Sequence, residues 1–185
     1  MQASYVLNLP FGKGRRFVNS LGRPVNMLVS GWSVNGITTF QSGFPVFLTE
    51  AQSNPLTQFF GGGTLRPNVV ADCRKKVSGS AQSRLGEWFN TSCFEYPGNY
   101  TFGNEPRVDA NLTSDGVSNY DFAAVKSTRF AGERANVQFR AEFFNIFNRV
   151  QFAPPVGQHG SSNFGTILSQ VNQPREIQFS LRVNF

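Results

Sequence analysis

Apolar and polar side chains alternate most regularly in the last segment of the chain, residues 174–185. From Ile177 onward an apolar side chain stands at every second position, and the positions between are polar. Successive side chains of a β-strand point to opposite faces, so this segment is predicted to be a strand with one apolar and one polar face. That pattern fits the edge of a soluble sandwich, and it also fits the last strand of an outer-membrane barrel.

The same alternation, less regular in places, predicts four further strands. They cover residues 3–9, 27–41, 120–130 and 134–147. Residues 131–133 contain a glycine and separate the last two of these strands, which predicts a hairpin. Residues 27–41 form a longer segment than an average globular strand, and a tilted strand of that length crosses a bilayer. The sequence therefore predicts an all-β, antiparallel meander of about five long strands.

Charged residues occupy the polar positions of the clearest strands. Arg140 and Glu142 fall on the same face of residues 134–147. Neither lipid nor a packed soluble core accepts such a face, whereas the water-filled lumen of a barrel does. We therefore predict that seven polar side chains face a lumen: Arg134, Asn136, Gln138, Arg140, Glu142, Gln178 and Arg182.

Two long connections, residues 42–118 and 148–173, show little periodicity. Irregular stretches of this length are unusual in a compact soluble domain but common among the extracellular loops of a barrel. If Phe185 lies at the periplasmic end, both long connections fall outside and the short connection 131–133 falls inside, as barrel topology requires. The connection 10–26 also falls inside, although it is longer than most periplasmic turns.

Five strands cannot close an outer-membrane barrel, because about eight is the minimum and unpaired edges are not tolerated in lipid. Met1 leads directly into a strand pattern without a signal peptide. The chain is therefore expected to be the C-terminal portion of a larger barrel, incomplete by itself, unless it is no barrel at all.

Composition supports a membrane surface rather than a nucleic acid as the partner. Hydrophobic residues make up 39% of the chain, yet 20 residues are Phe, and such an excess of rings is typical of barrel girdles. The net charge is +6, but the basic residues are dispersed, which argues against nucleic-acid binding. Outer-membrane lipid and lipopolysaccharide are the expected partners. No apolar run is long enough for a membrane helix.

Candidate chemistry is sparse. Cys73 and Cys93 both lie in the connection 42–118, where a disulfide would restrict a poorly packed loop, and free thiols are the alternative. His159 is expected to be a solvated loop residue. The chain offers no catalytic constellation, no metal-ligand set and no cofactor motif, so no enzymatic activity is expected.

The chain resembles the C-terminal end of TonB-dependent outer-membrane receptors, in particular the Oar-like group. The similar phrases follow the family's order along the chain, at residues 5–16, 30–45, 66–68, 88–94, 102–104, 119–126, 137–148, 164–165 and 174–185. Residues 106–118 depart from the family's usual pattern, so the resemblance does not extend to the shape of that loop.

This resemblance implies energised uptake of a large or scarce ligand through a barrel of about 22 strands in the bacterial outer membrane. It implies that Phe185 is the signal read by the barrel-assembly machinery. The plug and the TonB box of the family lie N-terminal to this segment and are absent here, so contact with the TonB complex would need that region. The segment is not expected to function alone. No ligand-binding residue transfers by motif, and the connection 42–118 is the favoured ligand-binding part.

A soluble β-sandwich binding module, for carbohydrate or for cell-surface attachment, is the alternative. It would use the aromatic rings as stacking platforms, and it predicts that the apolar faces of the strands pack against each other.

Overall fold

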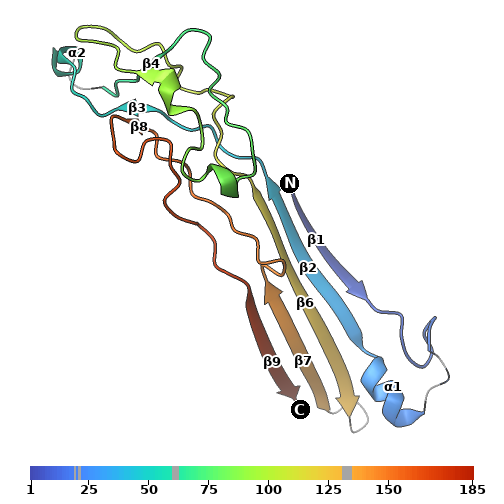
Figure 1. Ribbon diagram of the computed structural model, residues 1–185. Helices are drawn as coiled ribbons and strands as arrows, with labels where there is room; N and C mark the ends of the chain where they lie inside the picture. The colour runs from blue at the N-terminus through green and yellow to red at the C-terminus, as the bar shows by residue number, and fades with distance from the viewer. Residues whose placement is uncertain (19, 21, 60–62, 131–134) are drawn as a thin grey trace. The chain divides into compact units, whose positions relative to one another are not determined.

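The computed structural model describes residues 1–18, 20, 22–59, 63–130 and 135–185 (Figure 1). Its described residues divide into two compact units. We call them the strand unit (Met1–Gln41, Val117–Val150 and Gln173–Phe185) and the loop unit (Ser42–Gly116 and Gln151–Asn172).

The strand unit is a single antiparallel sheet. Its strands are β1 (Gln2–Asn8), β2 (Trp32–Gln41), β6 (Val117–Phe130), β7 (Ala135–Phe144) and β9 (Glu176–Asn184). Their order across the sheet follows their order along the chain, and every neighbouring pair is antiparallel (Figure 1). The predicted all-β meander of five strands is therefore confirmed.

Each face of the sheet has its own chemistry, because residues paired across neighbouring strands share a face. Ala141, for example, pairs with Ala124 on β6 and with Phe179 on β9. On this apolar face the side chains of Phe179 and Leu181 are each 67% exposed. The packed apolar faces that a soluble sandwich requires are therefore not found around these residues.

The predicted strand 27–41 is wrong at its beginning. Residues 27–29 belong to the helix α1 (Arg23–Val29), and β2 starts only at Trp32. Pro24 stands in the first turn of α1, where its fixed φ angle favours a helix, and Gly31 adopts a φ of 75° between helix and strand. The indole Nε1 of Trp32 donates a hydrogen bond of 2.9 Å to the Leu28 carbonyl, which fastens the helix to the strand.

The first residue of β6 and the last residue of β7 also differ from the predicted strand boundaries. β6 begins at Val117, before the predicted residue 120, and β7 ends at Phe144 rather than at residue 147. Asn145 and Asn148 have φ angles of 48° and 50°, a left-handed conformation that stops an extended strand. The hairpin turn 131–133 and Arg134 lie outside the described residues.

Within the described part of the chain, β1 and β9 each pair with one neighbouring strand. The sheet thus has two edges and forms no closed barrel, consistent with a partial barrel. Of the helices in the described residues, none combines the length and the apolar character needed to span a membrane.

The loop unit has a hydrophobic core of its own, which the sequence did not predict. Short elements surround it: β3 (Thr49–Glu50), α2 (Pro55–Phe59), β4 (Asn68–Val69), η1 (Gln82–Arg84), η2 (Thr91–Cys93), β5 (Phe94–Glu95) and β8 (Gln158–His159). β3 pairs with β8 in parallel, and β4 pairs with β5 in antiparallel fashion. The core consists of Val46, Leu48, Trp88, Phe89, Cys93, Phe94 and Leu112.

Candidate functional site

The polar residues predicted to face a lumen lie together on one face of the sheet, as far as they are described. Gln138 pairs with Arg182, and Glu142 pairs with Gln178, so β7 and β9 present these side chains side by side. Arg140 and Glu142 form an ion pair of 2.8 Å on this face. That the face lines a lumen stays a prediction, and Arg134 lies outside the described residues.

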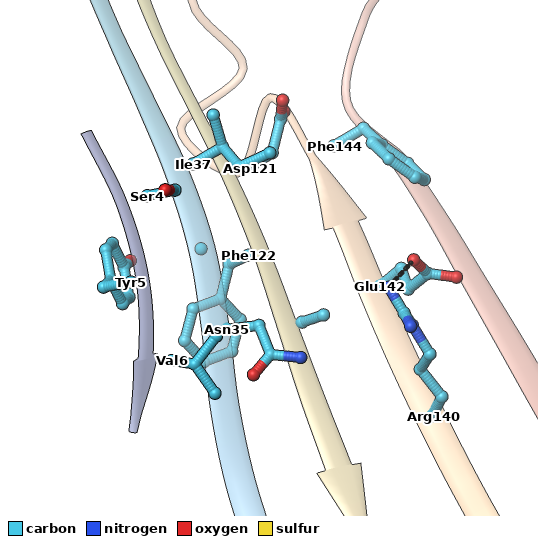
Figure 2. A pocket seen from close by; sticks show the side chains of 12 residues that line it. Ser4, Tyr5, Val6, Asn35, Ile37, Asp121, Phe122, Arg140, Glu142 and Phe144 are labelled. Atoms are coloured by element: carbon cyan, nitrogen blue, oxygen red, sulfur yellow. Dashed lines mark ion pairs between the residues drawn. The ribbon is translucent and has the colours of Figure 1, made fainter. Parts of the chain in front are cut away.

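A groove of about 290 Å³ runs across this polar face. Figure 2 shows the side chains around it, which come from β1, β2, β6 and β7. Val6, Asn35 and Asp121 come from the first three strands, and the Arg140–Glu142 ion pair lies on β7. The Oδ1 atom of Asn35 is buried and has no hydrogen-bond partner among the described residues. Buried acceptors are normally paired, so water or another part of a complete barrel is expected to donate a hydrogen bond here.

Aromatic side chains mark both ends of the apolar face. At one end the ring of Tyr120 packs edge-on against Phe40 and Phe147, with centroids 5.5 and 5.0 Å away. At the other end the ammonium group of Lys126 lies 5.5 Å from the ring centroid of Trp32. Amphipathic rings at the two limits of an apolar band are typical of membrane interfaces.

The two long connections leave the same end of the sheet. Gln41 pairs with Val117 across the ends of the connection between β2 and β6. Phe144 likewise pairs with Glu176 across the ends of the connection between β7 and β9. Phe130 and Ala135, the last described pair of β6 and β7, lie at the opposite end of the sheet. This arrangement of long and short connections is the one that barrel topology requires.

A disulfide between Cys73 and Cys93 lies in the core of the loop unit, where Cys93 is fully buried. Next to it the rings of Phe89, Phe94 and Phe164 pack edge-on against one another, with centroids 5.2 to 5.7 Å apart. Since Phe164 comes from the second long connection, the two connections share this core.

A buried ionic cluster, which no pattern in the sequence predicts, holds together distant parts of the loop unit. The Nζ atom of Lys75 lies 2.6 Å from Glu105 Oε2 and 2.6 Å from Asp109 Oδ2. Burial raises the pKa of Glu105 even though Lys75 opposes the shift. Burial is also the largest influence on Asp109 and acts to raise its pKa, but the hydrogen bonds from Lys75 and Asn111 together with the charge of Lys75 outweigh it, and that pKa lies below its usual range.

His159 is not the solvated loop residue that the sequence suggested. Its Nδ1 atom lies 2.6 Å from Oε2 of Glu50, whose side chain is almost completely buried. The two residues are register partners in the parallel β3–β8 pair. The sequence could not predict this contact, because Glu50 and His159 are far apart in the chain and come from different long connections.

No group of three or more potential metal ligands occurs in the described ranges. A family model described as an outer membrane beta barrel domain matches residues 1–178, which include the whole loop unit and all of the strand unit except its last seven residues. No curated protein and no solved structure matches the chain.

Proposed function

The chain belongs to the outer membrane beta barrel domain family, and we propose that it is the C-terminal barrel segment of a TonB-dependent receptor of the Oar-like group. Membership places it in the bacterial outer membrane. A receptor of this kind takes up a large or scarce ligand with energy delivered through TonB. The ordered phrases shared with that group support the proposal at the level of the sequence.

The observation that carries the proposal is the two-faced sheet with both long connections at one end. Its apolar face is exposed at Phe179 and Leu181, while β7 and β9 place charged and amide side chains on the other face. In a membrane the first face meets lipid and the second lines a wet lumen. The soluble sandwich is not favoured, because its apolar faces would be packed together.

The open sheet indicates how much of the receptor this segment supplies. Backbone groups at the outer edges of β1 and β9 need partners in lipid. We therefore propose that further strands of the same polypeptide close the barrel and that its plug and TonB box lie outside this segment. The segment is proposed to act in transport as part of that receptor, and not as an enzyme or a nucleic-acid-binding protein.

Partners follow from the position of each part. Lipid and lipopolysaccharide would cover the apolar face, the barrel-assembly machinery would recognise Phe185, and the loop unit would meet the ligand outside the cell. Contact with the TonB complex is assigned to the N-terminal region of the receptor.

Cross-linking in cells tests the receptor proposal. The intact polypeptide that carries this segment receives a photoactivatable residue in its N-terminal region, and a cross-link to TonB is expected. The same residue at Phe102, an exposed position of the loop unit, is the control and should yield no cross-link to TonB. Electrophoresis without boiling verifies that the barrel is folded, through its faster migration. A folded barrel that never cross-links to TonB would contradict the receptor proposal.

A further inference from the structure

Two adjoining cavities lie in the loop unit. The first has a volume of about 150 Å³ and the second about 280 Å³. Lys76 and Asn111 line both of them, so the cavities meet at these two residues. Together they are comparable to a small ligand site, one part for an anchoring group and the other for the remainder of a molecule.

Arg84 gives the first cavity a rigid cationic wall. Its guanidinium carbon lies 4.1 Å from the ring centroid of Trp88, and its Nη1 atom lies 3.5 Å from the Trp88 carbonyl oxygen. The Nε atom of Arg84 is buried and has no hydrogen-bond partner in the described part of the loop unit. A buried donor without a partner is costly, and the cavity that Arg84 lines is the place where its guanidinium group can take up an acceptor.

The charges around the first cavity favour an anion of low charge. Lys76 and Arg84 contribute two positive charges and Asp115 one negative charge, which leaves a formal balance of +1. At the second cavity Lys75 is already compensated by Glu105 and Asp109, and the positive charge of Arg74 offsets the remaining negative charge. A guanidinium group binds a carboxylate through two parallel hydrogen bonds.

Neutral polar groups complete the first cavity. Asn111, Thr113 and Ser114 line it, and amide and hydroxyl groups both donate and accept hydrogen bonds. Asn111 and Thr113 suit the hydroxyl groups of a ligand, whereas the Ser114 hydroxyl already accepts a hydrogen bond from the Phe44 N–H.

We infer that these cavities bind a small hydroxylated carboxylic acid, such as a sugar acid, with its carboxylate held by Arg84 and Lys76. The inference deepens the proposed function and rests on it for uptake, whereas binding itself requires no transport. Such acids occur both as free solutes and in the core sugars of lipopolysaccharide, and the two sources share this chemistry.

Tryptophan fluorescence tests the inference directly, because the chain has only 2 Trp and Arg84 covers one of them. In the variant Trp32→Phe, Trp88 is the sole tryptophan of this segment. The intact polypeptide that carries this segment is purified from outer membranes in detergent as this variant and titrated with glucuronate. The same titration with Trp88→Phe added identifies the emission change that belongs to Trp88. We expect a saturable change in Trp88 emission, which neither glucose nor sodium chloride at equal ionic strength reproduces. An equal response to glucose or to chloride would overturn the inference.

Two substitutions distinguish a specific binding site from nonspecific electrostatic attraction of anions. Arg84→Gln and Lys76→Gln should each weaken glucuronate binding about tenfold or more, because each removes a charged hydrogen-bond donor. Arg107→Gln is the matched control, since Arg107 is an exposed cation that lines neither cavity, and binding should not change. Arg84→Gln does not report on binding if it loosens the loop unit, which would appear as a red shift of Trp88 emission. In that case the affinity of Lys76→Gln for glucuronate tests the site, because Lys76 is exposed. Unchanged affinity in Lys76→Gln would reject the site.

Competition identifies the source of the acid. Lipopolysaccharide that displaces glucuronate indicates recognition of the membrane's own sugars, and lack of displacement indicates a free solute. The TonB cross-link described above is measured on the same receptor. Loss of glucuronate binding with that cross-link intact removes this inference alone, and loss of the cross-link alone removes the receptor proposal.

Discussion

The backbone N–H of Asn145, directly after β7, donates a hydrogen bond of 2.9 Å to Oδ1 of Asp121 on β6. The side chain of Asn145 is buried and reaches further. Its Oδ1 atom accepts a hydrogen bond from the backbone N–H of Arg149, and its Nδ2 atom donates to the carbonyl oxygens of Arg149 and Gln173. One residue thus ends a strand, closes a turn and holds the chain where it returns to the sheet.

Replacement of Asn145 by alanine should destabilise the strand unit. Asn145→Ala removes these side-chain hydrogen bonds, each of which contributes about 1 kcal/mol, and it leaves alanine at a φ of 48°. We expect a loss of roughly 3 kcal/mol in the free energy of unfolding, measured with urea on the intact polypeptide that carries this segment, in detergent micelles. Asn145→Gly is the matched control, and its loss should be about 1 kcal/mol smaller because glycine tolerates a positive φ. Equal losses would show that the backbone conformation contributes nothing.

The ring of Tyr5 lies over Gly36, its register partner on β2. A Cβ atom at Gly36 would overlap this ring, so Gly36→Ala should cost about 1–3 kcal/mol in unfolding free energy. In the double variant with Tyr5→Ala the overlap disappears, and the combined loss should be smaller than the sum of the two single losses. Gly86→Ala is the control, because a Cβ atom there meets nothing within 4 Å. Additive losses in the double variant would contradict the packing of Tyr5 on Gly36.

Lys75 is expected to control how the stability of the loop unit depends on pH. In the intact cluster the lowered pKa of Asp109 contributes stability above its usual value of 3.8, and this contribution is lost as the pH falls. The raised pKa of Glu105 acts in the opposite sense, favouring the folded state below 4.5 and losing that contribution as the pH rises.

The variant Lys75→Met leaves two buried carboxylates without their cation. The pKa values of both should then rise, so stability is retained in acid and is lost as the pH increases through them. At pH 7 we expect a loss of about 3–5 kcal/mol, measured as faster proteolysis of the loop unit than at pH 4. Lys76→Met, at the exposed neighbouring position, should change stability by about 0.5 kcal/mol or less. A Lys75→Met variant that is equally stable at both pH values would contradict the role of the cluster.

Deletion of Phe185 should lower outer-membrane insertion of the polypeptide that carries this segment, while its synthesis is unchanged. Phe185 is wholly exposed and contributes no packing, so a loss of insertion would reflect recognition rather than stability. Membrane fractionation and immunoblotting measure the effect. Phe102→Ala removes an equally large exposed ring from the loop unit and should insert normally. Normal insertion without Phe185 would refute its role as an assembly signal.

Local pattern predicted the sheet well, because the alternation of side chains along a strand is a property of the backbone itself. It predicted the five strands, the shared face of Gln138 and Arg182, and the end of the sheet from which the long connections leave. Helix α1 was not predicted, because three residues such as 27–29 are too few to distinguish the helical repeat of about 3.6 residues from the strand repeat of about 2 residues. The signals that decide it, Pro24 and Gly31, were read as parts of a turn and a strand.

By itself, the sequence determined which side chains of each strand point the same way, and therefore the two faces of the sheet. Only the tertiary structure decided that residues 42–116 and 151–172 share one folded unit. The contacts that build it, such as the hydrogen bond of 2.8 Å from the Trp88 N–H to the Gly165 carbonyl and the Glu50–His159 pair, join residues far apart in the chain. Such contacts leave no periodic trace in the sequence, because they depend on where loops meet in space and not on the repeat of a backbone.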